Sequence, residues 1–203
     1  MINETTLKEF LKLMSECNVI WGIGGSFLLE KYELHSNPAD LDLWVQASDM
    51  PIIRQKFSRF EELKSDVPLP PEYHYKIMFY DIEVDFVARF IRKPNKNVYQ
   101  YSIYPENIKF LELKNGVKIP CLYLEDWYVI YKLLRRDEKA EMIREAFKRS
   151  GEAFDEVAIG RSISCEYDNK LPGWLIQDIS ELTQYVNQIS LFDEPNGGND
   201  GIE

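Results

Sequence analysis

Four apolar residues near the N-terminus are spaced as one face of a helix requires: Leu7, Phe10, Leu11 and Met14. They fall at i, i+3, i+4 and i+7, the spacing of neighbouring side chains on a helical surface. Thr6 and Glu9 stand three residues apart, as in a capping box, so the helix is predicted to begin at Thr6. One face of this segment is expected to cover a core.

A strand, a glycine turn and a second strand are predicted next. Residues 19–21 form a short apolar run typical of a buried strand, which leads into the glycine-rich residues 22–26. A brief helix is expected over residues 27–32. Residues 40–45 then alternate polar and apolar, which is the pattern of a strand with one face in the core.

Two pairs of strand-like runs indicate β-hairpins: residues 75–80 with 82–90, and residues 108–113 with 117–122. Both pairs are rich in β-branched and aromatic residues. Asp81 separates the first pair, and Asn115-Gly116 separates the second. Asn-Gly between two such runs is the strongest short hairpin signal in this chain.

The pattern changes to helical after residue 122. Amphipathic runs predict helices over residues 125–135, 138–149 and 174–192, and the polar, glycine-rich residues 194–203 predict disorder. The chain is therefore expected to have an α+β fold, a mixed β-sheet flanked by helices with a C-terminal helical region. The expected parts are an α/β core over residues 1–122, a helical region over 123–192 and a disordered acidic tail over 193–203.

Composition fits a folded chain in a reducing compartment. Apolar residues make up 45% of the 203 residues, and a chain of this length buries roughly 70% of its unfolded surface without a disulfide or structural metal. Cys17, Cys121 and Cys165 are far apart and form no CxxC motif, which argues against a zinc site. With no signal peptide and no apolar run of membrane-spanning length, a cytoplasmic location without a membrane partner is expected.

The glycine turn and the strand after it carry the candidate chemistry. Gly24 and Gly25 lack side chains, so their backbone N–H groups can approach phosphate oxygens, and Ser26 can donate a hydroxyl hydrogen bond. Asp40, separated from the serine by thirteen residues, shares one strand face with Asp42, roughly 6.5 Å away. Two such carboxylates need a cation, and Mg²⁺ binds carboxylates together with substrate phosphates. The combination predicts metal-assisted nucleotidyl transfer.

Each half of this pattern has a plainer interpretation on its own. A Gly-Gly-Ser is usually a turn, and an Asp-x-Asp is often a solvated strand face. Their order, with strand, turn and helix before a second strand, favours the functional interpretation. A dinucleotide-binding fingerprint is disfavoured because the third glycine is missing, and no Gly-Lys-Ser/Thr indicates a P-loop.

The pattern resembles the motif of the nucleotidyltransferase superfamily, which includes DNA polymerase β, the aminoglycoside and lincosamide nucleotidyltransferases, and toxin-type transferases. The resemblance covers residues 20–145 and implies a nucleotidyltransferase-like mixed sheet. The superfamily has a third carboxylate on a later strand. Asp85 matches it because Val84 and Phe86 flank it, and Glu83 is the alternative on the same face.

The resemblance also assigns a lysine in the helical part. Residues 120–126 followed by 132–137 are similar to a helix start and downstream basic–acidic pair of stand-alone members. By that likeness Lys132 reaches the nucleotide phosphates, although a solvated helix lysine is the alternative. Asn37-Pro38 stands where many relatives carry an arginine, so one phosphate or acceptor contact differs.

The implied reaction is attack by an acceptor hydroxyl on the α-phosphorus of a nucleoside triphosphate (NTP), ATP among them, with pyrophosphate leaving. Asp40, Asp42 and Asp85 would hold two Mg²⁺ ions, or Mn²⁺ in their place, and Asp85 would take the acceptor's proton. Gly24, Gly25, Ser26 and Lys132 would bind the nucleotide.

The acceptor is left open by the sequence. The formal charge of −10 falls to −6 without the tail (24 basic against 30 acidic residues), which permits a cationic small-molecule acceptor. A basic run from Arg89 to Lys96 is either a solvated loop or an RNA contact. Two alternatives remain: a toxin-type transferase that modifies tRNA under an antitoxin partner, and a catalytically silent nucleotide-binding module. His35 and His74 lack metal-ligand spacing, and His35 is interpreted as a loop residue.

Overall fold

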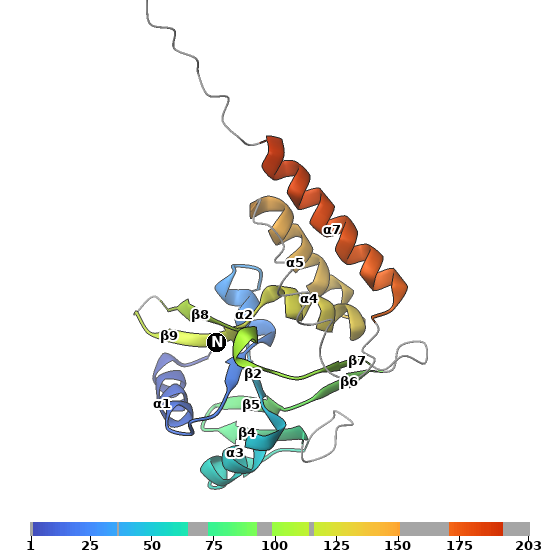
Figure 1. Ribbon diagram of the computed structural model, residues 1–203. Coiled ribbons are helices and arrows are strands. Elements are labelled where there is room, and N and C mark those ends of the chain that lie inside the picture. Colours follow the sequence, from blue (N-terminus) through green and yellow to red (C-terminus); the bar gives the residue numbers. More distant parts are fainter. Residues whose placement is uncertain are drawn as a thin grey trace, which may run out of the picture.

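The computed structural model describes residues 2–35, 37–64, 73–92, 99–113, 116–150 and 171–192. One mixed seven-stranded sheet forms its centre, with strand order β3-β4-β5-β2-β1-β9-β8. Figure 1 shows the C-terminal helices gathered on one side of this sheet, away from α1 and α3. The expected α+β architecture is confirmed.

The bounds of the sheet strands follow the chain: β1 Trp21–Ile23, β2 Asp40–Val45, β3 Glu61–Glu62, β4 His74–Phe79, β5 Ile82–Val87, β8 Ile108–Glu112 and β9 Lys118–Leu122. The pairs β2–β5 and β1–β9 are parallel, and the other neighbours are antiparallel. A second, two-stranded sheet joins β6 (Phe90–Arg92) to β7 (Tyr99–Tyr101). Both predicted hairpins are confirmed as β4–β5 and β8–β9, although Asn115 lies outside the described residues.

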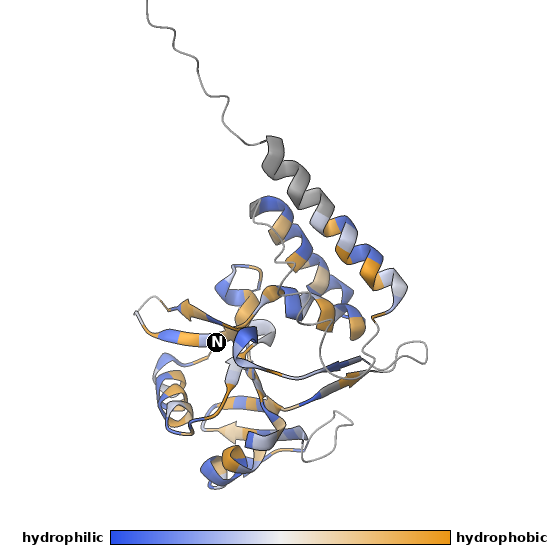
Figure 2. Cartoon of the chain, in the orientation of Figure 1, coloured by the Kyte–Doolittle hydropathy of each residue, from blue (hydrophilic) through white to orange (hydrophobic). Residues whose placement is uncertain are grey.

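The α-helices of the described residues are α1 Glu4–Ser15, α2 Gly25–Lys31, α3 Met50–Phe57, α4 Leu124–Leu133, α5 Asp137–Ser150 and α7 Gly173–Phe192. Short 3₁₀ turns precede α3 (η1, Ala47–Asp49) and β8 (η4, Pro105–Asn107). Figure 2 shows polar and apolar residues interspersed along the helices, as expected of helices that bury one face.

The predicted start of α1 at Thr6 is wrong. Asn3 is the N-cap, and its side-chain oxygen accepts a hydrogen bond from the backbone N–H of Thr5. Thr6 Oγ1 instead donates to Asp81 at 2.8 Å, and Glu9 accepts from the Tyr80 hydroxyl at 2.8 Å. Both residues of the supposed capping box therefore tie the helix to the β4–β5 turn.

An aromatic cluster holds α1 and α3 against the sheet. Phe10 of α1 lies 5.6 Å from Phe57 of α3 and 5.3 Å from Phe79 of β4, between ring centroids. Phe57 lies 5.4 Å from Phe86 of β5. Ring pairs at these separations add stabilisation beyond the area that they bury.

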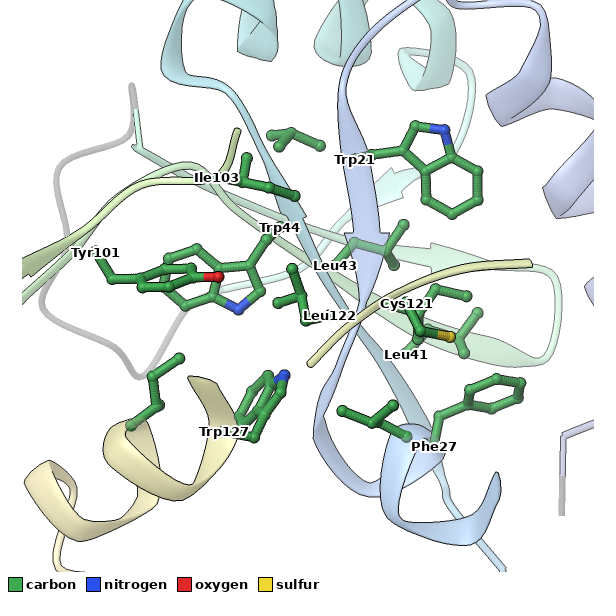
Figure 3. Close-up of a cluster of buried hydrophobic side chains, with 14 of the residues drawn as sticks. Trp21, Phe27, Leu41, Leu43, Trp44, Tyr101, Ile103, Cys121, Leu122 and Trp127 are labelled. Carbon is green, nitrogen blue, oxygen red and sulfur yellow. The ribbon is translucent and has the colours of Figure 1, made fainter. Parts of the chain in front are cut away.

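A second part of the core joins the sheet to α2 and α4. Figure 3 shows Phe27 of α2 and Trp127 of α4 in one cluster of buried side chains with Leu41 and Cys121 of the strands. Trp44 of β2 packs edge-on against Tyr101 of β7 at 4.8 Å. The predicted inward face of residues 40–45 is confirmed, because Leu41, Leu43 and Val45 are fully buried.

The change from sheet to helix falls where the sequence predicts it. The last sheet strand ends at Leu122, and α4 begins at Leu124. The division into a core over 1–122 and a helical region over 123–192 stays a prediction, and the tail over 193–203 lies outside the described residues. In the part of the chain that the structure describes, no helix is both long and apolar enough to cross a membrane.

Candidate functional site

The acidic residues come together through the parallel pairing of β2 with β5. In this register Asp42 lies beside Asp85, and Asp40 lies beside Glu83. Neighbouring strands are about 4.8 Å apart, and paired residues project from the same face. The structure thus places the three predicted acids, and Glu83 with them, on one face of the sheet.

Asp42 is the most strongly perturbed of these acids. Burial raises its pKa to about 7, and the charges of Asp40 and Asp85 add to the effect. Lys139 and Arg136 act in the opposite direction without cancelling it. Burial and the two neighbouring carboxylates therefore oppose the ionisation of Asp42 more than the two cations favour it.

The glycine turn lies directly against Asp42. The Gly24 N–H donates to the Asp42 carbonyl at 2.9 Å. Gly25 has φ +61°, and a Cβ there would stand 1.7 Å from the Asp42 Oδ2 atom. A Cβ on Gly24 would stand 1.9 Å from the Trp127 Nε1 atom. Position 25 therefore requires glycine to leave room for the Asp42 carboxylate, and position 24 requires glycine to leave room for the Trp127 indole ring.

Ser26 is bonded to a lysine that the sequence analysis missed. Lys139 Nζ of α5 donates to Ser26 Oγ at 2.9 Å and lies 5.5 Å from the centre of the Tyr131 ring. Burial lowers the pKa of Lys139, and Arg136 lowers it further, whereas Asp42 and Asp40 raise it. In sequence Lys139 lies between acidic residues, which is typical of a solvated helix face, so nothing local marked it.

Lys132 lies in a different environment. Its Nζ is 3.4 Å from Asp178 of α7 and 3.9 Å from Asp137, and it lies 5.7 Å from the centre of the Trp174 ring. The structure thus pairs Lys132 with the last helix and brings Lys139 to the glycine turn. A role for Lys132 in binding nucleotide stays a prediction.

Asp85 has a partner that the sequence analysis set aside. His74 Nε2 is hydrogen-bonded to Asp85 Oδ1, and the histidine side chain is buried. The hairpin register pairs His74 with Val87, two residues beyond Asp85 on the same face. A two-residue turn at Tyr80-Asp81 brings His74 to the face of Asp85, whereas the predicted turn at Asp81 alone, or metal-ligand spacing, does not.

Tyr131 leaves a donor unused beside the acids. Its hydroxyl is buried and has no hydrogen-bond partner among the described residues. Burial raises the pKa of Tyr131, and the negative charge of Asp42 adds to the rise. A buried hydroxyl without a partner is costly, so this atom is poised to meet a group that enters the site.

The donor set suits a hard divalent cation. Carboxylate oxygens on one face are the ligands that Mg²⁺ and Mn²⁺ prefer. Within the described ranges no three acid, histidine or cysteine side chains already converge as a metal cluster. One oxygen of Asp85 is hydrogen-bonded to His74.

No family model and no curated protein matches the sequence. Among solved structures, a candidate nucleotidyltransferase from Thermotoga maritima is 23% identical, with a TM-score of 0.52 over 73% of this chain and 96% of that one. A lincomycin-bound lincosamide antibiotic adenylyltransferase is 12% identical, with a TM-score of 0.49 over 71% of this chain and 98% of the other. The antibiotic-resistance factor ANT(2″)-Ia is 12% identical, with a TM-score of 0.48 over 91% and 96%.

The first of these likenesses confirms the predicted fold. Its alignment spans nearly the whole of the Thermotoga maritima protein, so the chain has the complete nucleotidyltransferase-like α+β fold. At 23% identity the likeness bears on fold alone. What the site does has to be argued from its own residues.

Proposed function

We propose that this chain is a metal-dependent nucleotidyltransferase that moves a nucleoside monophosphate from an NTP to an acceptor hydroxyl, releasing pyrophosphate. One observation carries the proposal: the Gly25 backbone lies against the Asp42 carboxylate, and Asp85 lies beside Asp42 on the next strand. A phosphate-accepting turn and three carboxylates therefore share one site.

Asp40, Asp42 and Asp85 are the residues that would hold the metal, two Mg²⁺ ions or Mn²⁺ in their place. When bound, such ions balance charge on the transferred phosphate and favour deprotonation of the acceptor hydroxyl. Asp85 keeps one carboxylate oxygen outside its hydrogen bond to His74. It is placed to take the proton of the acceptor hydroxyl.

The triphosphate would lie along the turn formed by Gly24, Gly25 and Ser26. Ser26 Oγ accepts from Lys139, which leaves the hydroxyl hydrogen for a phosphate oxygen. Lys139 adds a positive charge at that point, and charge-assisted bonds of this kind are about twice as strong as neutral ones. Lys132, which the family resemblance assigned to the phosphates, is a second candidate for this role.

The acceptor is a small molecule or an RNA end. The net negative charge of the chain supports a cationic small molecule. The RNA alternative rested on a basic run in which Arg89 is engaged with Tyr73, through a 3.3 Å hydrogen bond and a ring contact at 5.4 Å. Lys93 and Lys96 lie outside the described residues. We therefore place the small-molecule acceptor first.

The test is transfer of label from each α-labelled NTP in the presence of Mg²⁺ to a panel of cationic small molecules and total tRNA. The wild type is expected to label one acceptor class. Asp42→Asn is expected to lower turnover by at least 10³-fold, because the buried acid that would bind both ions is lost. Glu112→Gln, an exposed change on β8, is the matched control and should retain transfer.

The outcomes separate the alternatives. Labelling of tRNA, together with growth arrest on expression that Asp42→Asn relieves, would support the toxin-type transferase and an antitoxin partner. NTP binding without transfer to any acceptor would indicate the silent module. Transfer that is unchanged in Asp42→Asn would refute the proposed site itself.

A further inference from the structure

We propose that His74 is a positioning residue that acts through Asp85: it fixes one carboxylate oxygen of Asp85 and so directs the other toward the metal and the acceptor. This inference rests on the proposed function of the site. It goes beyond that function by assigning a role to a histidine that neither metal-ligand spacing nor the three-acid motif includes.

The bond itself sets the roles of the two groups. An ionised carboxylate can only accept, so the Nε2 atom of His74 carries the hydrogen that Asp85 Oδ1 receives. The His74 side chain is 3% exposed and that of Asp85 is 18% exposed. The histidine therefore lies behind the acid and not in front of it, where substrate would arrive.

The cation nearest in register does not hold Asp85. Lys76 is the direct strand partner of Asp85 on β4, but its Nζ bonds to Glu83 Oε2 at 2.7 Å. The side chain that orients Asp85 is therefore the His74 imidazole and not the Lys76 ammonium group. The pair with Glu83 keeps Lys76 from competing with His74 for the Asp85 oxygens.

The backbone of His74 is anchored from the opposite face. Arg54 of α3 donates through Nη2 to the His74 carbonyl at 2.8 Å, and its guanidinium lies 4.3 Å from the centre of the Tyr75 ring. The start of β4 is thus fixed by a helix on one side, while the imidazole reaches Asp85 on the other. A rigid support is what a ligand-orienting residue needs.

Stability alone gives a weak reason for a histidine here. Burying a polar ring costs free energy unless its hydrogen bonds are made, and a well-packed apolar ring of similar size avoids that cost. The His74 side chain is almost fully buried, so an apolar ring of similar size would be buried to the same extent. We infer that a histidine occupies this buried position because it orients Asp85.

The test compares His74→Phe, which keeps the ring shape and removes the donor, with His74→Gln, whose amide nitrogen can replace Nε2. His74→Phe is expected to lower kcat about 10- to 100-fold, with KM for the NTP changed less than about threefold. His74→Gln should recover most of the loss. Tyr75→Phe, the adjacent strand position on the opposite face, is the matched control and should behave as the wild type.

A second measurement is independent of turnover. Mn²⁺ affinity, followed by the electron paramagnetic resonance of the free ion, is expected to weaken in His74→Phe and to recover in His74→Gln. In an Asp85→Asn background, His74→Phe should lower kcat no further, because the carboxylate through which His74 acts is already absent. His74→Asn, which stays polar but is too short to reach Asp85, replaces the phenylalanine variant if that fails to fold.

The results distinguish this inference from the proposed function. Wild-type transfer with unchanged kcat and Mn²⁺ affinity in His74→Phe would overturn the role of His74 and leave the function standing. A wild type that binds Mn²⁺ without transferring a nucleotide overturns the function, and the Mn²⁺ affinities still decide the role of His74. A wild type that neither transfers nor binds Mn²⁺ overturns both.

Discussion

Asp42 lies partly buried between two acidic neighbours, and its pKa of about 7 is the result. A carboxyl group in that state is only partly ionised at neutral pH. Binding of a divalent cation requires the ionised form, so metal affinity and proton release are linked at this residue. The proposed cation would offset the free-energy cost of ionising Asp42 at this position.

The raised pKa of Asp42 predicts how stability depends on pH. Between about pH 4 and pH 7 the folded chain keeps a proton that the unfolded chain has released, so the free energy of unfolding falls as pH rises. Asp42→Asn should remove this dependence and stabilise the metal-free protein at pH 8 by on the order of 2 kcal/mol. Urea unfolding in a chelator at pH 5 and pH 8 measures both.

Added Mg²⁺ supplies the control for this prediction. At pH 8 it should restore stability to the wild type and leave Asp42→Asn unaffected, because the ion relieves the same repulsion that the substitution removes. Equal pH dependence in the two proteins would contradict the assignment of the buried charge to Asp42.

The roles of Lys139 and Lys132 can be distinguished by replacing each lysine with methionine. Lys139→Met is expected to raise KM for the NTP about tenfold or more, since a charge-assisted bond to phosphate is lost at Ser26. Lys132→Met should act mainly on stability, through its pair with Asp178. Lys148→Met, further along α5, is the matched control. A rise in KM at Lys132 with none at Lys139 would favour the role that the family resemblance assigned.

At the scale of elements, one carboxylate of the last helix contacts both of the helices that precede it. Asp178 of α7 accepts from the Tyr128 hydroxyl of α4, from Arg144 of α5 at 2.8 Å, and lies 3.4 Å from Lys132. Burial would raise the pKa of Asp178, but the Tyr128 hydrogen bond and the charges of Lys132 and Arg144 outweigh it and leave the pKa lowered. Three helices therefore meet at this residue.

Asp178→Asn is expected to destabilise the protein by about 1–3 kcal/mol at pH 7, because it removes a half-buried charge that faces two cations. A lowered pKa gives stability that is present above the unfolded pKa and is lost as pH falls through the folded one. The difference from wild type should thus shrink as pH falls toward 3 in urea unfolding. Asp137→Asn, an exposed change with a 3.9 Å contact, should have little effect.

Helix ends show where sequence patterns stop being sufficient. The stripe that predicts α1 is confirmed by the burial of Leu7, Phe10 and Met14. Its predicted start failed because Thr6 and Glu9 bond to a turn some seventy residues away. A capping box and a tertiary contact use the same residue types, and spacing along the chain does not tell them apart.

At the scale of the whole molecule, local patterns predict strands and hairpins but not the parallel pairs. The hairpin β4–β5 follows from the turn at Asp81, whereas β2 beside β5 joins residues more than forty positions apart. That pairing places Asp85 beside Asp42. The sequence alone identified Asp85 through a family likeness, and Lys139 stayed hidden because its partner, Ser26, is 113 residues away.

The close approach of Gly25 to Asp42 also fixes the order in which the two positions can change over evolutionary time. While the aspartate is present, any side chain at position 25 would overlap its carboxylate. Replacement of the aspartate by a small residue removes that overlap and leaves only the backbone strain of φ +61°. A side chain acquired at position 25 would then occupy the space of the lost carboxylate. Loss of the acid can therefore be followed by loss of the glycine, after which neither can return alone.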